Sequence, residues 1–168
     1  MRRLLLAGVL SATTVLNSTS AARAVEVPLD PTFADDGTVR ISASQMSDLS
    51  DVDVVHGQLY AGGADTESSP AAVLAVRMDD DGGFDNSFGA YGVARQPLSG
   101  MANPRTGMQV SGDGSSVLVA QSRVAVTVVR LSDGGQPDVQ FSGDGIRSWP
   151  VSAYHRTGAP LVTVDSSG

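Results

Sequence analysis

The segment Phe84-Asp85-Asn86-Ser87-Phe88-Gly89-Ala90-Tyr91-Gly92 decides the fold class, because degenerate copies of it occur on both sides. The earlier copy is Leu29–Gly37 and the later copy is Pro137–Gly145. Equivalent residues are separated by 55 positions and then by 53, which is the period of a repeat protein. Three residue types recur in register: Asp30, Asp85 and Asp138; Phe33, Phe88 and Phe141; Gly37, Gly92 and Gly145.

The repeat extends beyond this motif. Val76–Gly83 aligns without a gap with Val129–Gln136, and a turn followed by a strand recurs at His56–Gly62 and Gly112–Ala120 and begins again at Val164–Gly168. The second unit contains four strand-sized runs separated by turn residues, at 93–97, 107–110, 117–120 and 124–131. The chain is therefore predicted to be all-β, with β-propeller-like blades of four short antiparallel strands, incomplete at about two and a half repeats.

The recurring residues have structural roles that explain why they recur. Glycine supplies the positive φ of a tight turn. Aspartate closes a turn by accepting a hydrogen bond from the backbone two residues on. Phenylalanine buries a large apolar area between neighbouring units. We therefore interpret the recurring positions as structural.

These residues resemble the delta-60 repeat of bacterial exported and surface proteins. The pattern Arg-Leu-x-x-Asp-Gly-x-Leu-Asp-x-Ser-Phe-Gly-x-x-Gly is matched by Arg77–Gly92 and Arg130–Gly145, and in part by Leu29–Gly37. The copies depart from it at several positions, for example where Phe84 and Pro137 replace the second leucine. The resemblance implies a β-propeller-like array in an exported protein and supplies no common catalytic residues.

The N-terminus has the three parts of a secretory signal peptide in order. Arg2 and Arg3 precede a mostly apolar run, Leu4–Leu16, and Ala22-Arg23-Ala24 offers a cleavage site. We expect residues 1–24 to be a signal peptide and residues 25–168 to be a partial β-propeller-like array, with units starting near residues 29, 84 and 137. The predicted location is secreted, periplasmic or at the cell surface, without membrane insertion after cleavage.

Composition excludes several function classes. Removing Arg2, Arg3 and Arg23 from 11 basic residues leaves eight against 18 acidic ones, a formal net charge of −10. So acidic a surface repels nucleic acid and anionic membranes. The sequence contains no cysteine, which excludes disulfides, thiolate metal sites and cysteine nucleophiles.

A closed propeller has four to eight blades and needs more than roughly 200 residues. Three alternatives follow for a chain of 168 residues: a piece of a longer array, a ring completed by further copies of the chain, or a small open sheet protein. Open sheet edges would favour self-association by strand addition.

Acidic residues in loops are the candidate metal ligands, because Ca²⁺ prefers carboxylate and carbonyl oxygens. Asp35, Asp36 and Asp144 lie between the repeated Phe and Gly and are predicted to line one end of the propeller. Tyr91 replaces the equivalent Asp in the middle copy, which argues against a regular ladder of sites. Two further acidic clusters are more typical of solvated turns: Asp48, Asp51 and Asp53, and Asp79, Asp80 and Asp81.

No catalytic or cofactor-binding residues are identified. His56 and His155 are the two histidines, and neither has the spacing of a metal ligand. A Gly-x-Ser-x-Gly nucleophile motif is absent, and Trp149 is interpreted as packing between blades. The sequence thus predicts a non-enzymatic binding or scaffold module for an unknown protein or carbohydrate. The alternatives are a hydrolase or lyase with an active site in a propeller channel, and a calcium-stabilised adhesion domain.

Overall fold

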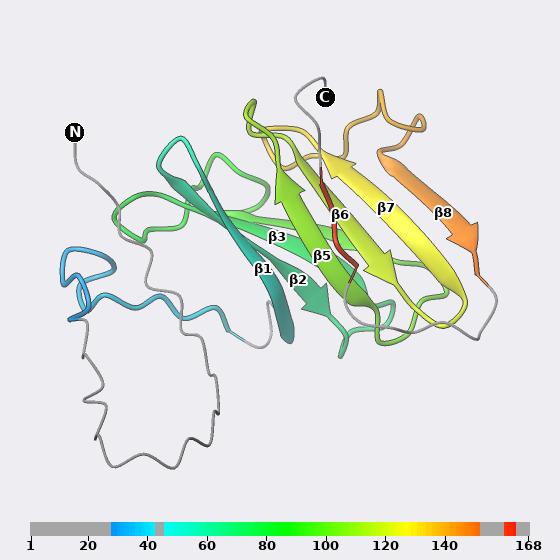
Figure 1. Ribbon diagram of the computed structural model, residues 1–168, viewed down its shortest axis with the longest axis horizontal. Coiled ribbons are helices and arrows are strands. Elements are labelled where there is room, and N and C mark those ends of the chain that lie inside the picture. The colour runs from blue at the N-terminus through cyan, green and yellow to red at the C-terminus, as the bar shows by residue number, and fades with distance from the viewer. Residues whose placement is uncertain (1–27, 43–45, 152–159, 164–168) are drawn as a thin grey trace, which may run out of the picture.

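The computed structural model describes residues 28–42, 46–151 and 160–163. Within these ranges the protein is all-β, consisting of two four-stranded antiparallel sheets and no helix (Figure 1). The first sheet contains β1 (Asp48–Val55), β2 (Gln58–Asp65), β3 (Ala72–Met78) and β4 (Val93–Pro97). The second contains β5 (Arg105–Val110), β6 (Ser116–Gln121), β7 (Ala125–Leu131) and β8 (Ile146–Pro150).

Each sheet is a meander in which consecutive strands are neighbours. This is the form of a propeller blade and confirms the predicted fold class. Local sequence explains the hairpins. His56 and Gly57, for example, have φ values of 53° and 84° and form the two-residue connection between β1 and β2, where both residues need positive φ.

The four predicted strands of the second unit all occur, but they are divided between the two sheets. The run at 93–97 is β4, which pairs with β3 of the first sheet, with Val76 opposite Val93. The other three runs are β5, β6 and β7 of the second sheet. The long β3–β4 loop returns the chain antiparallel to β3. The repeat unit of the sequence therefore contains the last strand of one blade and the first three strands of the next.

The core lies between the two sheets and includes Tyr60, Phe88, Met108 and Leu118. The blades approach most closely where β1 and β2 meet β5. Gly62 permits this approach, since a Cβ at Gly62 would lie 2.6 Å from the Cβ of Met108.

The other face of the first sheet is covered by the N-terminal segment, defined as residues 28–42. Val39 and Ile41 of this segment pack against a second cluster that contains Leu74 and Val76. All seven residues of β3 are buried, as expected of a strand with packing on both faces.

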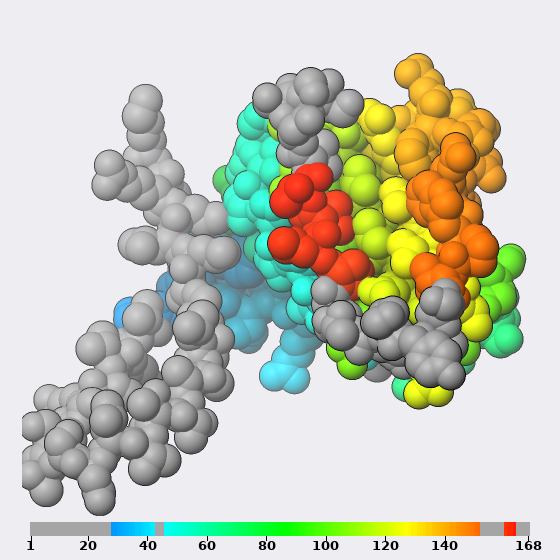
Figure 2. All heavy atoms as spheres, turned by 45° about the vertical axis from the view of Figure 1, so that its right-hand side comes forward, coloured from blue at the N-terminus to red at the C-terminus, as the bar shows by residue number. Residues whose placement is uncertain are grey.

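After β8 the chain returns to the start of β5. A Cβ at Gly107 would lie 2.2 Å from the carbonyl oxygen of Pro160, so residues 160–163 run against this strand. Figure 2 shows residues 160–163, in red, lying on the surface against the cyan and yellow-green strands.

Several predictions fall on residues outside the described ranges: the signal peptide at 1–24, His155, and the repeated element at Val164–Gly168. Within the described ranges, no helix has the length and apolar character needed to cross a membrane.

Candidate functional site

The three copies of the Asp-x-x-Phe-x-x-x-Gly motif fold into loops with the same hydrogen bonds. In each loop the Asp carboxylate accepts the backbone N–H two residues on, at 2.9, 2.8 and 3.0 Å for Thr32, Ser87 and Gln140. The N–H of the recurring Gly donates to the carbonyl oxygen of the recurring Phe at 2.6, 3.0 and 2.8 Å. The nine recurring residues therefore build one local structure three times.

The recurring glycine is required by backbone conformation and by space. Gly37, Gly92 and Gly145 have φ values of 81°, 83° and 78°, a region that other residues rarely adopt. A Cβ at Gly92 would lie 2.9 Å from the Cβ of Phe84, and a Cβ at Gly145 would lie 2.8 Å from that of Pro137. The glycine allows the loop to fold back on its own first residue.

The middle loop closes differently because Tyr91 stands where the other copies have Asp. Asp36 accepts the N–H of Thr38 at 2.8 Å, and Asp144 accepts that of Ile146 at 2.9 Å. Tyr91 offers no carboxylate, and the N–H of Val93 instead donates to Ala90 at 3.2 Å. Tyr91 has φ 56° and its side chain is 84% exposed.

Arg77, near the end of β3, is the centre of the contact between the blades. Its Nε donates to Asp85 at 2.8 Å and its Nη2 donates to the Ser87 hydroxyl at 2.8 Å. Its Nη1 crosses to the second blade and donates to Asp133, at 2.7 Å to the carbonyl oxygen and 2.8 Å to the carboxylate. The guanidinium carbon also lies 4.9 Å from the centroid of the Phe88 ring, within the range of a cation–π contact.

The same loops make backbone contacts with the next unit. Gly89, which follows Phe88, donates its N–H to the carbonyl oxygen of Gly134 at 2.9 Å. One repeat earlier, Ala34 donates to Asp81 at 2.6 Å. Gly135 packs directly on the Phe88 ring. A Cβ at this position would lie 3.0 Å from the ring, so only glycine fits there. We call the contact between the loop that carries Phe88 and the turn at residues 133–135 of the next blade the joint.

The electrostatics of the joint favour the charged forms of its ion pair. The pKa of Asp85 is lowered, first by the hydrogen bond from the Ser87 hydroxyl and then by the Ser87 N–H and the charge of Arg77, against an opposing effect of burial. Burial alone would lower the pKa of Arg77, but hydrogen bonding to Tyr60 and the charge of Asp85 raise it overall. A carboxylate and a guanidinium held in this way act as structural ions.

The candidate metal ligands are not brought together. Asp35 is exposed, while Asp36 and Asp144 each cap their own loop. In the ranges 28–42, 46–151 and 160–163, no three histidine or carboxylate side chains form a group that could hold a metal ion. The hydrogen bonds from Thr38 lower the pKa of Asp36, which favours the ionised carboxylate that caps the loop.

Of the first acidic cluster, Asp51 and Asp53 have a role that the sequence did not reveal. They lie on β1 and accept backbone N–H groups of β5, at 3.3 Å from Met108 and 3.3 Å from Val110. Gln109 adds a side-chain hydrogen bond to Asp53 at 3.0 Å. These carboxylates satisfy donors of a strand edge in the neighbouring blade. The available signal was the alternation of two aspartates along one strand.

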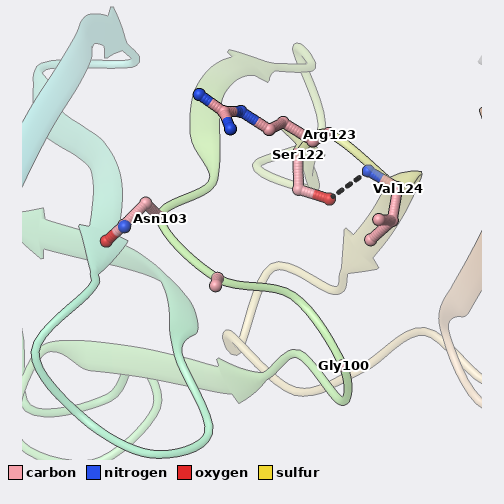
Figure 3. Close-up of a pocket in the computed structure, with 6 residues that line it drawn as sticks. Gly100, Asn103, Ser122, Arg123 and Val124 are labelled. Carbon is pink, nitrogen blue, oxygen red and sulfur yellow. Dashed lines mark hydrogen bonds between the residues drawn. The ribbon is translucent and has the colours of Figure 1, made fainter. Parts of the chain in front are cut away.

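A shallow hollow lies at the opposite end of the strands from the joint. It is formed by the β4–β5 loop and the β6–β7 hairpin, and is lined by Gly100, Ala102, Asn103, Ser122, Arg123 and Val124. Figure 3 shows Asn103 and Arg123 toward one side of the hollow and Val124 on the other. The Ser122 hydroxyl accepts the N–H of Val124 at 3.2 Å and so fixes the hairpin. Arg123 is exposed and has no polar partner among the described residues.

The remaining candidates lie on the surface. His56 is exposed in its hairpin turn, and Asp79, Asp80 and Asp81 are exposed in the β3–β4 loop. Trp149 is 43% exposed, with Arg147 5.5 Å from its ring centroid, and it lies on β8 rather than between the two described blades.

Comparison of the chain with protein-family models, with curated proteins and with solved structures finds no match.

Proposed function

We propose that the protein is an exported, non-enzymatic repeat protein of the β-propeller type, whose blades form a rigid scaffold that binds a protein or carbohydrate. The proposal rests on the observation that the recurring residues at the joint bind other parts of the protein. Arg77, Asp85 and Phe88 all contact protein groups that hold one blade on the next. The resemblance to the delta-60 repeat supports the same reading.

The loops at the two ends of the blades have different contacts. At the joint end, the β3–β4 and β7–β8 loops span residues 79–92 and 132–145, are equal in length, and make the contact between the blades. The other pair of connections at that end, 56–57 and 111–115, differs in length, as do the β2–β3 loop at 66–71 and the β6–β7 hairpin at 122–124 at the other end. Binding residues commonly lie on loops that a rigid framework positions. Because the long loops of the joint end are occupied by the contact between the blades, we assign the ligand to the end that carries the hollow.

Arg123 and Asn103 give this hollow polar groups that a carbohydrate or peptide can engage, and Val124, 57% exposed, gives it an apolar contact. The experiment is affinity electrophoresis of the purified chain against a panel of neutral and acidic polysaccharides, with immobilised peptides as a second panel. We expect retention by at least one member and loss of retention in Arg123→Ala, with an unchanged melting temperature. Arg40→Ala, which changes an exposed arginine of the N-terminal segment, is the matched control.

Two outcomes would contradict the proposal. The first is the absence of retention by every member of both panels. The second is turnover of a polysaccharide or an ester by the wild-type chain, which would favour the hydrolase or lyase alternative.

Export has its own test: mass spectrometry of the protein from the periplasm or medium should find a chain that begins at Val25, because Ala22 and Ala24 form the predicted cleavage site.

A further inference from the structure

The third copy of the loop, Pro137–Gly145, reproduces one half of the joint without the other half. Its Arg130 forms an ion pair with Asp138 at 3.1 Å, as Arg77 does with Asp85 at 2.8 Å. Asp138 donates its N–H to the carbonyl oxygen of Arg130 at 2.9 Å, and Asp85 does the same to Arg77 at 3.0 Å. The loop is therefore formed in advance of any partner.

The exposed fractions of equivalent residues show that no turn covers the third loop within the described residues. The side chain of Arg77 is 6% exposed, whereas that of Arg130 is 34% exposed. Phe88 is fully buried, while Phe141 is only half-buried. The N–H of Gly89 reaches the next turn, but Ser142, its equivalent, is exposed and its N–H has no acceptor among the described residues.

The complementary half of the joint also occurs in the chain, at the β3–β4 loop. Asp80 is the repeat equivalent of Asp133, the residue that accepts from Arg77. Asp80 is exposed and has no ion-pair or hydrogen-bond partner within the described ranges. The N-terminal segment packs on this turn, with a Cβ on Gly82 lying 2.8 Å from Ala34. The first copy of the repeat has no arginine equivalent to Arg77, because the residue 55 positions earlier is Ala22.

We propose that a second copy of this chain docks head to tail on the third loop, with its Asp80 taking the place of Asp133 against Arg130. The geometry is that of the joint within one chain. The Asp81 carbonyl of the second copy accepts the Ser142 N–H, as Gly134 accepts that of Gly89. Gly82 covers Phe141, as Gly135 covers Phe88. Opposite charges meet at the position where the internal joint has an ion pair.

Docking in this geometry exchanges two contacts that each chain makes with itself. The N-terminal segment leaves the turn and the sheet face that it covers, with Val39 and Ile41, and that turn gains Arg130, a partner that the segment does not offer. Residues 160–163, which run against β5, give way to β1 of the second copy, because β1 and β5 are the first strands of their blades and the first strands of successive blades pack on each other within one chain. The interface is heterologous, so successive copies form an open chain or a ring.

The test is the size of the purified chain in solution, measured by light scattering and sedimentation velocity over a concentration series. We expect assembly that grows with concentration and is weakened about tenfold or more by either Arg130→Gln or Asp80→Asn. Arg123→Gln and Glu67→Gln change exposed charges at the opposite end of the blades and serve as matched controls. Thermal unfolding of each variant verifies that it is folded.

A charge exchange makes the test specific. Arg130→Asp and Asp80→Arg chains should each stay monomeric, and their mixture should assemble again, because a joint between two like chains then has like charges, whereas both joints between unlike chains have opposite charges. A wild-type chain that remains monomeric at every concentration overturns the proposal. So does assembly that both charge variants leave intact while Ser148→Pro on the exposed edge of β8 abolishes it, since that result assigns association to strand addition.

Discussion

Arg77 and Asp133 are 56 residues apart in sequence and belong to different blades, yet Nη1 of Arg77 donates to both the carbonyl oxygen and the carboxylate of Asp133. The distances are 2.7 and 2.8 Å. Because the same guanidinium also binds Asp85 and Ser87 within its own blade, it fixes the turn of the second blade relative to the Phe88 loop of the first. The contact therefore sets how neighbouring units are oriented.

Replacing Arg77 by glutamine should destabilise the protein by about 3 kcal/mol, because it leaves the half of the pair in the first blade buried without its cation. Asp85 is 13% exposed, whereas Asp133 is 70% exposed and regains water, which places the cost at the lower end of the usual range. Urea unfolding followed by circular dichroism measures the change. Arg130→Gln is the control and should cost under about 1 kcal/mol, since Arg130 is 34% exposed. Equal costs for the two variants would show that the contacts of Arg77 with Asp133 add nothing to stability.

Phe88 and Phe141 allow a second comparison within one motif. Phe88 is fully buried and meets Tyr60 edge to face, with ring centroids 6.0 Å apart and an interplanar angle of 89°. Phe88→Ala should cost about 3–4 kcal/mol because the tightly packed joint cannot collapse around the lost ring. Phe141 is half-buried, and Phe141→Ala should cost about 1 kcal/mol. The midpoints of urea unfolding give both values, and a larger loss at Phe141 would contradict the assignment of Phe88 to the core.

Sequence periodicity was enough to predict the strands and the turns, because Gly92 and its equivalents are dictated by local backbone conformation. It also placed Phe88 in the contact between units. It did not predict that β4 pairs with β3, since the direction of a returning loop depends on contacts that the period does not encode. Nor did it identify the partner of Arg77.

The residues at the joint show why this partner was missed. Arg77 and Arg130 recur in register, but Asp133 contacts Arg77 only after two blades have packed. The carboxylates of Asp51 and Asp53 likewise acquire their role from the exposed N–H groups of β5. The recurring aspartates Asp30, Asp85 and Asp138, in contrast, accept from N–H groups two residues away, and this role was predicted from sequence alone.

Tyr91→Asn should stabilise the protein by about 1 kcal/mol. Tyr91 has φ 56°, a conformation that is costly for a bulky side chain and is tolerated better by asparagine. Little packing is lost, because the side chain is 84% exposed. Gly92→Ala in the same turn should destabilise by more than about 1 kcal/mol, since its φ is 83° and the new Cβ would meet Phe84. Thermal melts of both variants test the pair, and a fall in stability for Tyr91→Asn would show that the tyrosine makes a contact of its own.

Asp65 should make the protein sensitive to acid. Hydrogen bonds from Ser68, through its hydroxyl and its N–H, lower the pKa of this carboxyl from 3.8 to about 2, with help from Arg95 and the N–H of Glu67 and against the effect of burial. A carboxyl whose pKa is lower in the folded state stabilises the protein above its unfolded pKa and loses that contribution as the pH falls. The loss should therefore develop between about pH 4 and about pH 2.

The measurement is the melting temperature of the wild type and of Asp65→Asn as a function of pH. The variant should melt lower than the wild type at neutral pH, because the amide cannot replace a carboxylate that holds the loop after β2 and pairs with Arg95 at 3.1 Å. The difference between the two should shrink as the pH approaches about 2, where the wild-type carboxyl also becomes neutral. The comparison isolates Asp65 from other carboxyls with lowered pKa, such as Asp85 and Asp113, which both chains share. A difference that stays constant down to the lowest pH would mean that the charge of Asp65 does not stabilise the fold.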